Sequence, residues 1–299
     1  MQRVARVLLV AAMVFGPGAL GLAWGQAAGG APKQASAPVC DRGEFRLIVD
    51  VGHTAESPGA TSSRGFMEYD FNLRLAKEIE QKLLEAGFTK TMLLVTEGKG
   101  LKGLFKRVLV ANRTEADLFL SIHHDSVPSY FMEKWEYEGQ DLKFSDRFKG
   151  HSIFISNSNG DVKASLDFGS LLGKQLKARG LQYTPHYTEA FMKNRRRQLV
   201  DADAGVYRYD QLIVLRATRM PAVLLEAGSI INRDEELLLG KPEHRALITA
   251  AVSKAVEAFC AARRPLNPHL IARSQRSSPT KNIFRPAAAA QPAKPGAKQ

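Results

Sequence analysis

The sequence lacks the features of several specialised protein classes. It has only two cysteines and two tryptophans among 299 residues, which excludes a disulfide-rich scaffold and disfavours a cysteine-ligated zinc site. Only the N-terminus has an apolar run long enough to concern a membrane, so a multi-span membrane protein is excluded. Acidic residues are absent from residues 1–25 and 261–299, which together hold ten Lys and Arg residues. Removing those ten charges from the net charge of +12 leaves +2 for residues 26–260, so the folded part gives no reason to expect nucleic-acid binding.

The N-terminus has the pattern of a secretory signal peptide. Arg3 and Arg6 precede the apolar run of residues 7–15, and small residues follow as far as Ala27. The run is too short and too interrupted by glycine and proline to span a bilayer comfortably, although a retained anchor is an alternative. We therefore expect an exported protein that is periplasmic or associated with the cell wall, with no stable membrane span.

Composition divides the chain into four segments. Residues 26–39 have the composition of a linker, and the C-terminal residues are rich in proline, alanine and basic residues with little to bury. The expected organisation is a signal peptide over 1–27, a linker over 28–44, one folded domain over 45–262 and a disordered basic tail over 263–299.

The region between the linker and the tail alternates between strand and helix patterns. Short β-branched apolar runs predict strands, and apolar positions recurring every three or four residues predict helices. The strands are expected at 46–51, 91–96, 116–123, 151–156, 212–216 and 222–226, and the helices at 67–86, 101–114, 162–179 and 242–262. This order predicts a single α/β domain with a twisted, mostly parallel sheet of about six strands and helices on both faces.

The two cysteines flank this domain. Cys40 lies just before the first expected strand, and Cys260 lies at the end of the last expected helix. In an oxidising compartment such a pair can form a disulfide, and closing a loop of about 220 residues would stabilise the fold by roughly 4–5 kcal/mol. Two unrelated buried thiols are the alternative.

Four polar residues stand where a ligand site of such a sheet is expected. His53 follows the first strand by two residues, and His123 ends the third strand. Glu226 ends the last strand, and Glu68 stands at the start of the first helix. Parallel sheets bind ligands beyond the carboxyl ends of their strands. Two imidazoles and one carboxylate form a zinc ligand set with an open position for water, and a further carboxylate could be the general base.

Each of these residues also has an ordinary structural alternative. A glutamate in a first helical turn, such as Glu68, can simply complement the helix dipole. His53 could cap a turn, and His123 could be a partly buried imidazole. Glu226 is harder to dismiss because it directly follows a buried apolar run, where an unpaired charge is costly. Residue types and positions alone leave the convergence of the four side chains open.

Three ordered blocks of sequence resemble a known family. They are Ile48–His53 with Gly65–Leu73, then Arg107–Asp125, and then Pro221–Asn232. Together they resemble the zinc-dependent N-acetylmuramoyl-L-alanine amidases of the amidase-3 type over roughly residues 45–260.

The resemblance implies a function and a role for each candidate residue. It makes His53, Glu68 and His123 the ligands of Zn²⁺ and Glu226 the catalytic carboxylate. The implied substrate is peptidoglycan, cut at the amide bond between N-acetylmuramic acid and L-alanine for cell-wall remodelling, daughter-cell separation or recycling. We expect a monomer, with an activator protein as a candidate partner. The alternatives are a catalytically silent peptidoglycan-binding module or regulator, and another zinc peptidase acting on the stem peptide.

Four features depart from the family pattern or leave a choice. His124 stands where the family has a small residue, but adjacent strand residues point to opposite faces, so a fourth ligand there is not expected. Ser229 replaces an aromatic residue of the pocket wall.

Residues 128–149 form a longer connection rich in aromatics, either a lid or substrate platform or a surface loop with its own cluster. The basic run 193–197 could hold stem-peptide carboxylates or be a solvated loop.

Overall fold

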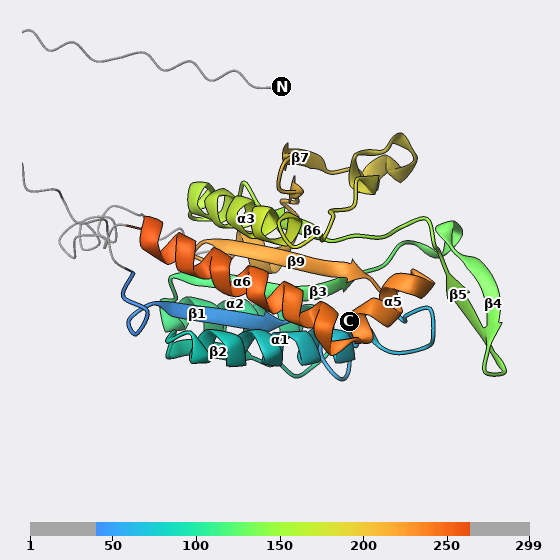
Figure 1. The fold of residues 1–299 in the computed structure, drawn as a ribbon, viewed down its shortest axis with the longest axis horizontal. Coiled ribbons are helices and arrows are strands. Elements are labelled where there is room, and N and C mark those ends of the chain that lie inside the picture. Colours follow the sequence, from blue (N-terminus) through green and yellow to red (C-terminus); the bar gives the residue numbers. More distant parts are fainter. Residues whose placement is uncertain (1–39, 264–299) are drawn as a thin grey trace, which may run out of the picture. The chain divides into compact units, whose positions relative to one another are not determined.

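A computed structural model describes residues 40–263 of the chain (Figure 1). Seven strands in this part form one sheet in the order β2-β1-β3-β9-β6-β8-β7. Their bounds are β1 Arg46–Val51, β2 Lys90–Leu94, β3 Leu118–Asp125, β6 Ser152–Ile155, β7 Gln198–Asp201, β8 Val206–Arg208 and β9 Ala222–Ser229. The helices are α1 Glu68–Glu85, α2 Gly100–Thr114, α3 Val162–Lys177, α4 Ile213–Arg216, α5 Arg233–Gly240 and α6 Pro242–Ala262.

The sheet is parallel where the candidate site is expected. β2, β1, β3 and β9 run in parallel, so their carboxyl ends meet at one edge. β6 runs antiparallel to β9, β8 is parallel to β6, and β7 returns antiparallel to β8. The expected α/β class with a mostly parallel sheet is therefore confirmed, with an antiparallel step on one side.

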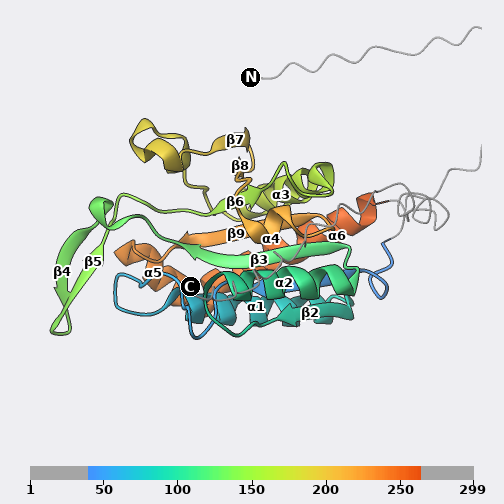
Figure 2. The same cartoon turned by 180° about the vertical axis from the view of Figure 1, so that it is seen from behind.

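Helices cover both faces of this sheet. α1, α3 and α6 lie on one face in Figure 1, and the view from behind shows α2 and α4 on the other (Figure 2). Each face has its own buried apolar cluster, one containing Leu120 and Leu225 and the other Phe119 and Leu224. Because successive residues of β3 and β9 alternate between these clusters, the central strands are buried on both sides.

One predicted strand is wrong. Residues 212–216 form the short helix α4, in which the amides of Leu215 and Arg216 both donate to the carbonyl of Leu212. A short apolar run fits a buried strand and a buried helical turn equally well, so the pattern could not separate them. The additional strands of the sheet are β7 and β8, which are short, and with them the strand number rises from about six to seven.

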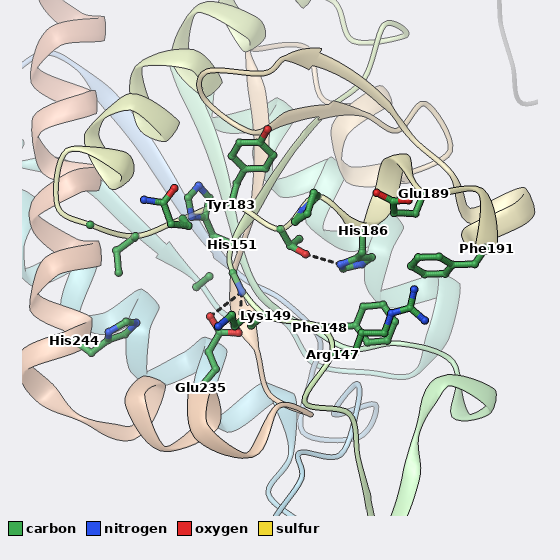
Figure 3. A pocket seen from close by; sticks show the side chains of 17 residues that line it. Arg147, Phe148, Lys149, His151, Tyr183, His186, Glu189, Phe191, Glu235 and His244 are labelled. Carbon is green, nitrogen blue, oxygen red and sulfur yellow. Dashed lines mark hydrogen bonds between the residues drawn. The ribbon is translucent and has the colours of Figure 1, made fainter.

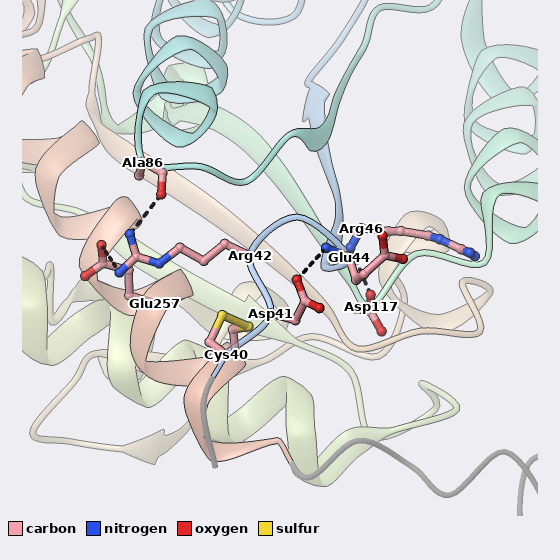
Figure 4. Close-up of a disulfide and its surroundings, with 9 residues drawn as sticks. Cys40, Asp41, Arg42, Glu44, Arg46, Ala86, Asp117 and Glu257 are labelled. Carbon is pink, nitrogen blue, oxygen red and sulfur yellow. Dashed lines mark hydrogen bonds and ion pairs between the residues drawn. A yellow bond between two sulfur atoms is a disulfide. The ribbon is translucent and has the colours of Figure 1, made fainter. Parts of the chain in front are cut away.

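The sequence leaves open whether the two cysteines are bonded, and the structure shows the disulfide. Cys40 and Cys260 are bonded, with 5.2 Å between their Cα atoms (Figure 4). The bridge joins the segment before β1 to the last turn of α6. Arg42, two residues further on, donates to the carbonyl of Ala86 at 2.8 Å and lies 3.3 Å from the carboxylate of Glu257. The segment from Cys40 onward is therefore part of the folded domain.

Most of residues 128–149 form a separate hairpin beside α5. It comprises the 3₁₀ turn η1 (Ser129–Phe131), β4 (Glu133–Tyr137) and β5 (Gln140–Phe144) (Figure 1). The indole of Trp135 donates to the carbonyl of Ser63 at 2.9 Å, and the guanidinium of Arg233 lies 3.8 Å from the ring centre of Phe144. These contacts fix the base of the hairpin, and no ring contact or hydrogen bond in residues 40–263 links it to the candidate metal ligands.

The structure does not describe the predicted terminal segments. The signal peptide over 1–27 and nearly all of the tail over 263–299 lie outside the described residues. Within residues 40–263, no helix combines the length and the hydropathy that a bilayer crossing requires.

Candidate metal centre

The three candidate ligands converge at the carboxyl edge of the parallel strands. His53 lies in the loop after β1, Glu68 is the first residue of α1, and His123 lies near the end of β3. The two oxygens of Glu68 lie 3.0 Å from Nε2 of His53 and 3.0 Å from Nδ1 of His123. One ligand atom from each residue can be chosen so that all lie within 4.8 Å of one another. The structure therefore brings together residues that are far apart in the sequence.

The position of His53 depends on a buried ion pair beneath it. Nε of Arg107 lies 3.0 Å from Oδ1 of Asp50, and both side chains are almost fully buried. The Arg107 guanidinium also donates to the carbonyls of Val51, at 2.8 Å, and of His53. His53 has a φ of +65°, which is unfavourable for a residue with a side chain. Arg107 therefore stabilises the backbone conformation that turns the imidazole toward Glu68.

The carboxylate of Glu68 is held from three sides. Its Oε2 accepts from the amide of Ala60 at 3.1 Å, and its Oε1 accepts from the side chain of Asn72 at 3.2 Å. Burial would raise the pKa of Glu68, but hydrogen bonds with His123 and His53 outweigh it and hold the pKa well below its usual range. The side chain is thus a buried, ionised carboxylate that contacts both histidines, which the helix-dipole alternative does not explain.

Two glycines leave the space that these side chains occupy. A Cβ at Gly52 would overlap the ring of His123. Gly59 has a φ of +83°, and a Cβ there would overlap Oε2 of Glu68 and approach the His53 ring to 2.7 Å. Glycine is required at both positions because the side chains of the candidate ligands pack directly against the backbone.

Gly59→Ala should weaken zinc binding by about 10–100-fold, in the range found when groups that orient metal ligands are lost. The added methyl group displaces Glu68 or His53. The backbone strain that a side chain causes at a positive φ would arise at any glycine in this conformation, so it is not specific to Gly59. Competition with a chromogenic chelator measures the affinity. Gly139→Ala is the matched control, since Gly139 has a φ of +76° but a Cβ there would meet no other atom within 4 Å. Equal losses in the two variants would contradict the crowding argument.

Glu226 lies on the strand next to His123. β3 and β9 are in register at these two residues, so their backbones are direct neighbours. Oε2 of Glu226 is buried and has no hydrogen-bond partner among residues 40–263. Burial, and then the charges of Asp125 and Glu68, raise the pKa of Glu226 well above its usual value. An unpaired buried carboxylate beside three donor atoms is the arrangement expected where a cation completes the site.

The donor set suits zinc. Two imidazole nitrogens and one carboxylate oxygen are the ligands of many catalytic zinc sites, in which the fourth position stays open. The side chain of His53 is 32% exposed, so this edge of the site opens to solvent. His53, Glu68 and His123 can therefore hold the metal, with Glu226 free to act on a substrate or water.

His124 does not belong to the group of candidate metal ligands, as its strand position predicts. Its Nδ1 lies 2.8 Å from Oδ1 of Asn72, and the side chain is buried against α1. Burial lowers the pKa of His124 to about 3. The imidazole is therefore a neutral core residue on the opposite face of β3 from His123.

Asp125 and Tyr187 form a second polar group that sequence reasoning missed. The Tyr187 hydroxyl lies 2.9 and 2.8 Å from the two oxygens of Asp125, and Nε2 of His186 lies 3.9 Å from Oδ2. Burial raises the pKa of Asp125 to about 7 despite the bond from Tyr187. The available signal was a carboxylate at the end of a buried strand, but its tyrosine partner is 62 residues away.

A cavity of about 640 Å³ adjoins this group (Figure 3). His186, Phe148 and Arg147 line one part of it, and His151 and Glu235 line another. Its volume lies in the range of small-ligand sites, about 300–1,000 Å³. The cavity is a recess with aromatic and charged walls, and His186 links it to Asp125.

The basic run 193–197 lies near the same group but is largely exposed. It belongs to the 3₁₀ segment η3 (Ala190–Arg195) and the residues after it. Burial raises the pKa of Asp125, and the charge of Arg195 opposes that shift. Burial lowers the pKa of His186, and the charge of Arg195 lowers it further. The proposed contact with stem-peptide carboxylates remains a prediction.

Comparisons with known proteins identify the family of this chain. A family model described as N-acetylmuramoyl-L-alanine amidase matches residues 47–258. The N-acetylmuramoyl-L-alanine amidase AmiA of Escherichia coli is 24% identical over 243 residues, covering 73% of this chain and 76% of that protein.

Solved structures give the same fold. The amidase Ami1 from Mycobacterium smegmatis matches with a TM-score of 0.56 at 17% identity, covering 74% of this chain and 99% of its own. The CwlD amidase from Clostridioides difficile, in complex with the GerS lipoprotein, matches with a TM-score of 0.53 at 18% identity, covering 73% and 100%. The family model spans most of the described domain, and the resemblance seen in the sequence is confirmed. The chain therefore belongs to the N-acetylmuramoyl-L-alanine amidase family, a family of peptidoglycan hydrolases.

Proposed function

We propose that the protein is an exported zinc amidase that cuts the amide bond between N-acetylmuramic acid and L-alanine. The observation that carries the proposal is the convergence of His53, Glu68 and His123, with Glu226 on the adjacent strand. The family supports the reaction class, and the N-terminal pattern and the disulfide support export.

The chain's own residues have separate roles in this reaction. Zinc, held by His53, Glu68 and His123, would supply a nucleophilic water at neutral pH and polarise the scissile carbonyl. Glu226 accepts the proton of the attacking water. It returns that proton to the nitrogen of L-alanine as the C–N bond breaks, so the products are an amine and a carboxylic acid. The remaining acid proton then passes to the amine, which leaves a carboxylate on the lactyl group and an ammonium group on L-alanine.

Digestion of purified peptidoglycan by the zinc-loaded protein tests the proposal. Mass spectrometry should find stem peptides with a free L-alanine amine, together with glycan chains that have lost their peptides. Treatment with a chelator should stop the release, and added zinc should restore it. Cleavage within the stem peptide would instead identify a zinc peptidase. Peptidoglycan binding without any cleavage would identify a silent binding module.

An activator protein remains part of the proposal. CwlD, which shares the fold, is seen in complex with a lipoprotein, so an amidase domain of this type can associate with a separate protein. The hairpin of residues 128–149 and the cavity beside Asp125 are available for either substrate or partner. If digestion requires a second protein, a deletion of residues 130–148 that restores basal activity would assign an inhibitory role to the hairpin.

A further inference from the structure

The outward face of α2 carries a row of exposed apolar side chains. Leu101, Phe105 and Leu109 are 63%, 55% and 50% exposed. They recur every fourth residue, so they form one stripe about 12 Å long on the helix surface. The opposite face of α2 packs onto the sheet through other residues, which are Gly103, Arg107, Val108 and Ala111. The exposed row is therefore additional to the apolar surface that the fold uses.

Basic side chains flank this row. α2 contains no acidic residue, and its N-terminal neighbour is Lys99. Asn112 joins α2 to the segment after α4, since its side chain bonds to the carbonyl of Ala217 and the amide of Arg219. Five exposed cations of α2 and this neighbouring segment have no ion pair within residues 40–263, namely Lys102, Lys106, Arg113, Arg216 and Arg219.

Acidic residues lie beside the ends of the helix and not within it, and Glu56 is bonded to Gly98 just before its start. Glu97 precedes it and Glu115 follows it, and the carboxylate of Glu115 lies 3.7 Å from the guanidinium of Arg46. The surface thus combines large apolar side chains with a net positive charge. Single exposed apolar residues are ordinary, but a contiguous row rimmed by cations marks an interaction surface.

We propose that the α2 face, defined as Leu101, Lys102, Phe105, Lys106 and Leu109, binds an anionic lipid surface. A helix with Leu and Phe beside Lys residues is the pattern of interfacial helices, whose apolar side chains enter the acyl boundary while the cations contact headgroups. The row projects from the convex outer side of a helix. A flat lipid surface fits that shape better than a peptide, which binds in a groove.

The proposal places the metal centre near the lipid. The segment leading into α2 is tied to the loop that follows His53, because Oγ1 of Thr54 donates to the carbonyl of Gly98 at 2.9 Å and the amide of Gly98 donates to Glu56 at 3.1 Å. Binding through α2 would hold the edge of the sheet that carries the ligands beside the lipid surface. This would restrict the enzyme to the part of the wall that adjoins a membrane.

Vesicle sedimentation of the full-length, zinc-loaded protein tests the proposal. Vesicles contain phosphatidylcholine and phosphatidylglycerol in equal parts, or phosphatidylcholine alone. The double variant Phe105→Ser/Leu109→Ser should partition onto the anionic vesicles at least about tenfold less than the wild type, because two large side chains no longer leave water. The matched control is Phe66→Ser/Leu237→Ser, whose side chains are 58% and 50% exposed on other elements, and it should bind like the wild type.

The basic C-terminal residues could also attract anionic vesicles, but both double variants retain them, so they contribute equally to the two binding measurements. Thermal melts and digestion of soluble peptidoglycan fragments check that each variant is folded. Lys102→Glu/Lys106→Glu should also lose binding, and more so at low salt. Equal binding by wild type and the Phe105→Ser/Leu109→Ser variant would overturn the proposal. A concentration-dependent dimer, or binding to an acidic helical peptide, that the same variant abolishes while vesicle binding persists would assign the face to a protein instead.

Discussion

Replacement of Glu226 by alanine or glutamine is expected to leave zinc bound and to lower kcat by about 10²–10⁴-fold, the contribution of a positioned acid–base group. The carboxylate lies on the strand beside His123 but makes none of the contacts that join the three ligands. It is therefore available to take and return a proton without holding the metal. Zinc content and the rate of stem-peptide release are measured on the same preparation.

His123→Ala provides the matched control because it alters the neighbouring residue on the paired strand. It removes a ligand, so it should lose zinc and turnover together. Asp125→Asn is the second control, since Asp125 is a buried carboxyl group near Glu226 that is not a candidate ligand and already has a donor in Tyr187. A Glu226→Gln enzyme with a near wild-type rate would contradict the role of this residue as general base. Loss of zinc from that variant would make it a ligand.

The long helices and the buried parallel strands could be predicted because they have strong periodic patterns. The helix expected over 67–86 is α1, Glu68–Glu85, and the strand expected over 46–51 is β1. Helix α6 has the predicted bounds, Pro242–Ala262. Buried parallel strands and long amphipathic helices leave signals that extend over many residues, so local sequence is sufficient to identify them.

The far side of the sheet could not be predicted in the same way. β8 has three residues and β7 has four, of which Gln198 and Asp201 are polar. Strands this short are set by pairing with neighbouring strands rather than by their own pattern. Residues 212–216 show the opposite error, because a strongly apolar run formed a buried helical turn.

The candidate site residues were apparent in the sequence, but the contacts that support them were not. His53, Glu68, His123 and Glu226 stand at or next to the ends of the elements expected from the sequence, where the topology of a parallel sheet directs attention. The contact between Arg107 and Asp50 joins residues 57 positions apart, and nothing local pairs them. Asp50 did indicate that an unidentified partner was needed, since a carboxylate inside an apolar strand requires one. The sequence thus indicates the chemistry of the site, whereas its geometry depends on tertiary contacts.

The second large effect is expected from the disulfide. Cys40→Ser/Cys260→Ser should lower the free energy of unfolding by about 2–5 kcal/mol, which corresponds to a decrease in Tm of roughly 5–15 °C for a domain of this size. The bridge spans 220 positions, so its absence releases almost the whole domain in the unfolded state. The loop-closure entropy is therefore near the upper end of the known range.

Thermal melting in the presence and absence of a reductant measures this effect. The wild type should lose stability on reduction, whereas the double serine variant should not respond, and the two should then melt together. Arg42→Ala is the control for the same region, because it removes the exposed contacts to Ala86 and Glu257 but keeps the bridge, and exposed ion pairs contribute only about 0–1 kcal/mol. The disulfide lies at the opposite end of β1 from His53, so the variant should bind zinc with unchanged affinity below its melting temperature. A loss of stability no larger than that of Arg42→Ala would show that the disulfide does not constrain the unfolded chain.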